Sequence, residues 1–93
     1  MYKIETKGAK HYVIPTADTV MDNFKRFEMP YDSNWEIYKL FNYSAKDFMD
    51  YVISAFNATV IIHYEFPWLE FYFSRYIDAE DFLKEINKRI NNP

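Results

Sequence analysis

The residues best suited to chemistry in this chain are a histidine and a carboxylate on neighbouring segments with strand-like alternation. His63 and Glu70 flank the dipeptide Phe66-Pro67. If the two segments pair with a turn about that dipeptide, His63 lies opposite Glu70. A carboxylate orients and charges an imidazole, so the pair could act as a general base. A nucleophile or a metal would have to join them, and we favour a surface cross-strand pair.

The rest of the sequence supplies no such group. The other histidine, His11, lies in a separate segment, and the two histidines have no spacing typical of a metal site. Cysteine is absent and glycine occurs once, as Gly8, which excludes thiolate chemistry and glycine-rich phosphate loops. The serines lack the glycine-flanked turn of a catalytic nucleophile. We therefore predict no catalytic residue, no metal and no cofactor, and a protein that is not an enzyme.

Aromatic side chains are the second unusual feature. Nine Phe, nine Tyr and two Trp among 93 residues exceed what a core of this size needs. Tyr and Trp are the types that rigid protein-binding surfaces use. One face of the strands around Phe66-Pro67 combines rings with acids, and we predict it to bind a protein partner through Ile61, His63, Glu65, Trp68, Glu70 and Tyr72. Alternatively, residues 33–42 cover this face, or its rings only stabilise the strand pair.

Charge and hydropathy restrict the partner. Eleven Lys and Arg are scattered among 14 Asp and Glu, for a net charge of −3. A nucleic-acid-binding domain needs a basic face, so direct nucleic-acid binding is not expected. No apolar run approaches the roughly 18–20 residues of a membrane span, and the first thirty residues lack a signal-peptide pattern. We expect a cytoplasmic protein with no membrane contact.

The predicted elements begin with a hairpin. Gly8-Ala9 suits a type II′ turn that sets Ile4 opposite Val13. A helix is predicted after Thr16, with an apolar stripe through Phe24 and a stop at Pro30. Residues 33–42 suit a helix or a strand equally, because a capping-box pattern there coincides with strand-favouring types.

The second half of the chain is more regular. Ser44 caps a helix whose predicted buried face is Phe48, Met49, Val52, Ile53 and Phe56. Alternation over Thr59 to Arg75 predicts two paired strands, with Ile62 opposite Phe71. A last helix is predicted from Asp78 as its N-cap, with an apolar stripe at Phe82, Leu83, Ile86 and Ile90.

Together these elements predict one compact α+β domain over residues 1–93. An antiparallel sheet of two hairpins, with four or five strands, would carry about three amphipathic helices on one face.

In size, mild acidity and aromatic content the chain is similar to small inhibitors encoded by phages and mobile elements, anti-CRISPR proteins among them. This likeness is one of composition and transfers no residues. We expect a small acidic protein that inhibits or regulates another protein by surface occlusion. The alternative is a structural or oligomeric subunit, such as a homodimer, that self-associates through an exposed strand and rings.

Overall fold

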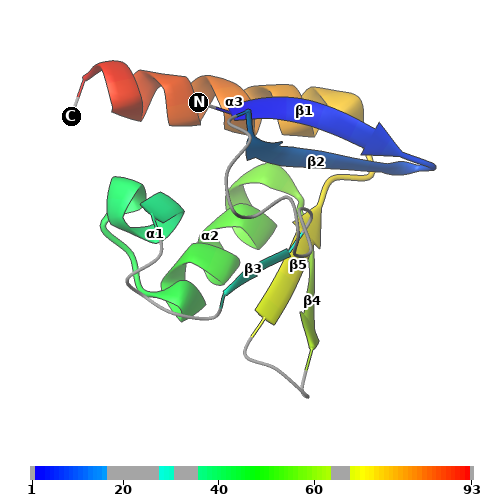
Figure 1. The fold of residues 1–93 in the computed structure, drawn as a ribbon, viewed down its shortest axis with the longest axis horizontal. Coiled ribbons are helices and arrows are strands. Elements are labelled where there is room, and N and C mark those ends of the chain that lie inside the picture. Colours follow the sequence, from blue (N-terminus) through cyan, green and yellow to red (C-terminus); the bar gives the residue numbers. More distant parts are fainter. Residues whose placement is uncertain (1, 17–27, 31–35, 64–67, 93) are drawn as a thin grey trace.

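The computed structural model describes residues 2–16, 28–30, 36–63 and 68–92, with backbone alone for residues 28–30, 36, 63 and 68. Within these ranges the elements are β1 (Tyr2–Lys7), β2 (Lys10–Pro15), β3 (Glu28–Pro30), α1 (Glu36–Phe41), α2 (Ala45–Phe56), β4 (Thr59–His63), β5 (Trp68–Tyr72) and α3 (Tyr76–Asn91) (Figure 1). The predicted α+β class is confirmed. Most of the helix predicted after Thr16 lies outside the described residues, but its predicted extent up to Pro30 is wrong, because residues 28–30 form the strand β3.

The strands form two antiparallel sheets, so the prediction of a single sheet is wrong. β1 and β2 make one sheet, and the other has the order β3-β5-β4. A backbone bridge joins them: the N–H of His11 donates to the carbonyl of Phe73 at 3.0 Å, and that of Phe73 donates back at 2.8 Å. The helices also pack against different sheets, since α3 contacts β1 and β2 whereas α2 contacts β4.

The first hairpin has the predicted register. Ile4 pairs with Val13 and Glu5 with Tyr12. Gly8 takes a φ of 63° at the first turn position, where a type II′ turn requires a positive value. The turn chemistry of two residues therefore sets the pairing of the whole hairpin.

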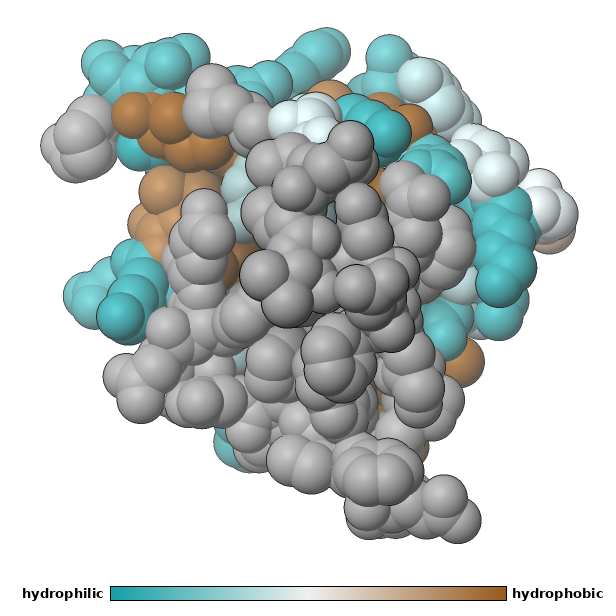
Figure 2. Space-filling model, in the orientation of Figure 1, coloured by the Kyte–Doolittle hydropathy of each residue, from teal (hydrophilic) through white to brown (hydrophobic). Residues whose placement is uncertain are grey.

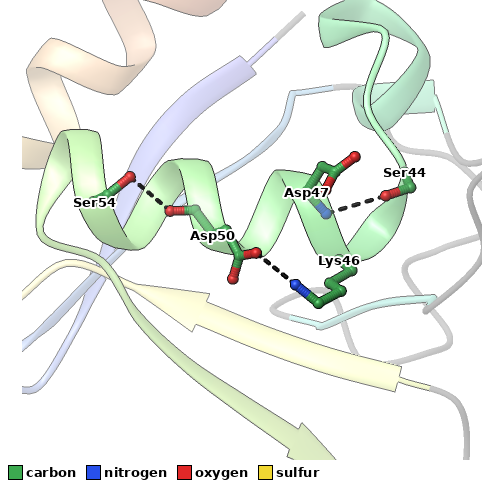
Figure 3. A network of polar contacts seen from close by, with 5 residues as sticks. All are labelled: Ser44, Lys46, Asp47, Asp50 and Ser54. Carbon is green, nitrogen blue, oxygen red and sulfur yellow. Dashed lines mark hydrogen bonds and ion pairs between the residues drawn. The ribbon is translucent and has the colours of Figure 1, made fainter.

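Polar side chains cap the N-terminus of α2, as predicted from the sequence, and lie along its solvent-exposed face. The Ser44 hydroxyl accepts a hydrogen bond from the Asp47 N–H at 3.1 Å and caps the helix (Figure 3). Further along, Lys46 pairs with Asp50 at 2.8 Å, and the Ser54 hydroxyl donates to the Asp50 carbonyl at 2.8 Å (Figure 3). These contacts mark the face of α2 that stays in solvent.

The buried face of α2 is narrower than predicted. Phe48, Met49 and Val52 are buried, but Ile53 is 47 % exposed, so its predicted burial is wrong. The buried stripe centres on Phe48 and Val52, and each residue along a helix turns by about 100°, which carries Ile53 outward.

Residues 36–41 form a helix, which decides between the two alternatives left open for this segment. Ile37, Tyr38 and Phe41 of α1 are buried. The helix packs against α2 and α3. Helical spacing therefore overrides the strand preference of these side chains.

The last helix begins earlier than predicted. Arg75 precedes its first turn, so the assignment of Asp78 as N-cap is wrong. Asp78 lies inside the first turn, is 6 % exposed, and accepts two hydrogen bonds from the Arg75 guanidinium, both at 3.1 Å. A carboxylate in this position also favours the helix dipole.

The core centres on the ring of Phe82, which is fully buried on α3. Ring centroids 5.3 to 6.1 Å away belong to Phe41, Phe48, Phe56, Phe71 and Phe73. Partly buried hydrophobic residues pack against this core, and apolar surface is visible between α1 and the C-terminal half of α3 (Figure 2). One side chain thus joins α1, α2, α3 and the end of β5.

We expect Phe82→Ala to lower the free energy of unfolding by about 3–5 kcal/mol, because it removes a fully buried ring. Tyr76→Ala is the matched control, since this ring on the same helix is 50 % exposed. Urea unfolding followed by circular dichroism measures both. Equal losses in the two variants would contradict the central position of Phe82.

Candidate protein-binding surface

The two faces of the β4–β5 pair are as predicted, but the register differs. Ile62 pairs with Leu69 rather than Phe71. β4 ends at His63 and β5 begins at Trp68, so residues 64–67 connect the strands, which agrees with the longer connection that the sequence left open beside a two-residue turn about Phe66-Pro67. Phe-Pro is unsuited to a two-residue hairpin turn. A shift of two residues keeps every side chain on its predicted face.

The new register separates the predicted acid–base pair. His63 pairs with Trp68, and Glu70 pairs with Ile61, so the prediction of His63 opposite Glu70 is wrong. Within the described residues, no three His, Asp or Glu side chains come together as metal ligands would.

Glu70 and Tyr72, two of the predicted partner-binding residues, lie beneath β2. The Tyr12 hydroxyl donates a hydrogen bond to Glu70 Oε2 at 2.6 Å, and Lys10 Nζ lies 3.7 Å from the same oxygen. Lys10 Nζ is also 4.7 Å from the centre of the Tyr72 ring, and the rings of Tyr12 and Tyr72 are 6.1 Å apart. These four side chains form one intramolecular cluster, which we call the β2–β5 cluster.

The β2–β5 cluster covers two of the six residues predicted to bind a partner, Glu70 and Tyr72. Tyr12 is only 4 % exposed, and the Glu70 side chain is 15 % exposed. A buried carboxylate needs such partners, because an unpaired charge out of water is costly. The first hairpin thus covers Glu70 and Tyr72, whereas α1, the described helix of the segment 33–42, packs against α2 and α3 instead. Lys10 and Tyr12 alternate on one face of β2, but no local pattern ties that face to β5.

Among the other predicted residues, Ile61 is the one whose side chain the structure describes, and it is exposed. Ile61 is 38 % exposed and Ile62 is 42 % exposed, although they point to opposite faces of the sheet. Ile53 of α2, the helix that contacts β4, is 47 % exposed. His63 and Trp68 occupy the strand ends with only their backbones described, and Glu65 lies outside the described residues.

β4 is the outermost strand of its sheet. The strand order is β3-β5-β4, and no other described strand lies along its far side (Figure 1). Each residue of such an edge has backbone groups that point away from the sheet at alternate positions. β4 therefore combines exposed isoleucines with an edge along which the described ranges place no further strand.

A second apolar pair is exposed where α3 begins. Tyr76 is 50 % exposed and Ile77 is 47 % exposed. The Tyr76 ring stands edge-on to the His11 ring, with centroids 5.4 Å apart, and His11 Nδ1 lies 2.8 Å from Thr6 Oγ1. This pair was not predicted, because the helix was expected to begin at Asp78 and in fact begins at Tyr76.

A largely buried aromatic cluster surrounds Tyr51, with the ring centroids of Phe41, Tyr43 and Phe56 5.3 to 5.5 Å away. Burial raises the pKa of Tyr51 above its usual value and the Glu85 carboxylate raises it further, while Arg89 opposes both effects. Arg89 also lies over the Phe41 ring, 4.4 Å from its centre, and pairs with Glu85 at 3.1 Å. Tyr51 is therefore held as a neutral hydroxyl in a structural contact.

Comparison with protein-family models, with curated proteins and with solved structures gives no match to this chain. None of the helices in the described ranges combines the length and apolar character needed to cross a membrane. The surface geometry is therefore the basis for proposing a function.

We expect Tyr12→Phe to lower the free energy of unfolding by about 1.5–3 kcal/mol. The substitution keeps the ring but removes a hydrogen bond to a charged, largely buried acceptor. Tyr76→Phe is the control, because its hydroxyl belongs to a half-exposed side chain. Chemical unfolding of both variants measures the difference, and an unchanged Tyr12→Phe protein would show that the β2–β5 cluster does not hold β2 in place.

Proposed function

We propose that this protein acts by binding another polypeptide along the free edge of β4. The observation that carries the proposal is an uncharged edge strand with two exposed isoleucines, Ile61 and Ile62. A polypeptide that adds a strand to such an edge gains backbone hydrogen bonds, and pockets or apolar contacts for alternate side chains supply specificity.

Two other strands at sheet edges, β1 and β3, carry features that discourage such pairing, and the remaining edge strand, β2, already bridges to Phe73 through His11. β1 has Lys3, Glu5 and Lys7 at alternate positions, and β3 ends with Pro30, which has no N–H to donate. Charges and proline are the usual means by which proteins protect an edge strand. β4 has the sequence Thr-Val-Ile-Ile-His, with neither. An unprotected edge beside two protected ones supports a role in binding.

The proposed consequence of binding is occlusion. A partner strand held along β4 is withdrawn from other contacts, so the protein would inhibit or regulate the partner without chemistry of its own. The binding surface that we propose is therefore the edge of β4, in place of the outer face of β4 and β5 that was predicted from the sequence. Of its predicted residues, Ile61 lies on that edge, as does the backbone of His63.

We expect Ile61→Lys and Ile62→Lys to weaken partner binding by roughly thirtyfold or more, the effect of about 2 kcal/mol at a hot spot. Lysine discourages pairing at an edge. Tagged proteins would be used for affinity capture from the native host, with mass spectrometry and cross-linking to locate the contact.

Ile77→Lys is the matched control, because Ile77 has a similar exposure of 47 % but lies on α3. The control should bind as the unmodified protein does. Binding that survives both β4 substitutions and is lost in Ile77→Lys would place the contact surface at the start of α3 instead.

A further inference from the structure

We propose that the strand that pairs with β4 is β4 of a second copy of this chain. This inference rests on the proposed binding role of the β4 edge and names its partner. It predicts a symmetric dimer in which the two three-stranded sheets become one continuous antiparallel sheet.

Symmetry leaves few ways to make this pair. Two identical antiparallel strands in one sheet are related by a twofold axis perpendicular to the sheet. Residues directly opposite each other point to the same face, and this axis keeps each residue on its own face. One residue of β4 must therefore lie opposite itself in the second copy.

Ile61 is the residue that gives the full overlap. It is the middle of the five residues of β4, Thr59–His63. With Ile61 opposite Ile61 of the second copy, Val60 pairs with Ile62 and Thr59 pairs with His63. A centre at Val60 or Ile62 would leave two residues of β4 without a partner from the other β4. The Ile61-centred register therefore forms the most backbone hydrogen bonds.

The side chains of β4 suit a copy of themselves. Thr59–His63 contains no Asp, Glu, Lys or Arg, although the chain carries 11 basic and 14 acidic residues. Like charges directly opposite each other destabilise a strand pair, and pairs of β-branched side chains stabilise it. The proposed register brings no formal charges together in the strand, and it sets Ile61 against itself on one face and Val60 against Ile62 on the other.

The dimer also covers the exposed apolar surface of this part of the molecule. Ile61 and Ile62, which are 38 % and 42 % exposed, would contact the second copy from opposite faces of the joined sheet. The strand order would be β3-β5-β4 followed by the same strands reversed, so that both unprotected edges become interior and the outer strands are those ending in Pro30. Removing this apolar area from water favours association.

The absence of cysteine allows a direct test with single substitutions. In Ile61→Cys, the two thiols would lie on directly opposed residues, with Cα atoms roughly 4.5 to 5.5 Å apart, within the range of a disulfide. Mild oxidation should give a covalent dimer on a non-reducing denaturing gel. In Thr59→Cys, the two thiols would be separated by four residues, about 13 Å, so this variant should stay monomeric under the same treatment.

A mixture tests the register itself. Thr59→Cys and His63→Cys proteins, mixed before oxidation, should form a disulfide-linked heterodimer, because Thr59 lies opposite His63 in the proposed pair. Cross-linking of Thr59→Cys alone as readily as Ile61→Cys would overturn the register.

Sedimentation equilibrium completes the test. The unmodified chain should reach about twice its 11.4 kDa mass as concentration rises. Ile61→Lys should remain at the monomer mass while keeping its circular dichroism spectrum, and Ile77→Lys should dimerise. A chain that stays monomeric at every concentration, with no cross-link in Ile61→Cys, would overturn the inference. If Ile61→Lys then still abolished capture of a different protein, the binding role of the β4 edge would stand with a foreign strand as its partner.

Discussion

Burial of β5 on both of its faces is the constraint on which the rest of the structure depends. One face of β5 and of the residue that follows it packs against aromatic rings of α2 and α3, and the buried side chains on this face are Leu69, Phe71 and Phe73. On the other side, Glu70 and Tyr72 lie beneath β2. A strand covered on both faces needs two layers, and the two-stranded sheet and the helices supply them. β4, next to β5, has partial cover, and its side chains are correspondingly exposed.

The bridge between His11 and Phe73 positions one of these layers. It consists of two backbone hydrogen bonds, and it fixes β2 where Tyr12 reaches Glu70. Charge makes the contact specific, because Glu70 between a tyrosine hydroxyl and an ammonium group is far better satisfied than an isolated carboxylate would be. The first hairpin is therefore an essential layer of the fold, although its own pairing is entirely local.

Local interactions explain what the sequence could predict. The Gly8 turn, the Ser44 cap and the alternation of β4 and β5 each depend on residues close together in the chain, and each agrees with the structure. The contact of Tyr12 with Glu70 joins residues 58 apart, and β3 contributes only three residues, too few to show alternation. Local pattern therefore identified the faces of β4 and β5 correctly but could not show that β2 covers one of them. The exposure of Ile61 follows from strand order, which is also a long-range property.

The proline at the end of β3 has a consequence for the size of any assembly built on β4. Edge pairing of identical subunits can continue indefinitely into a fibre when both edges of a sheet accept a neighbour. Here one outer strand offers a row of donors and acceptors, while the opposite one ends in a residue without an N–H. Growth through β4 would thus terminate after a single step. An open edge strand can lead to uncontrolled polymerisation in other proteins. In this protein, pairing through the edge of β4 would stop at the dimer.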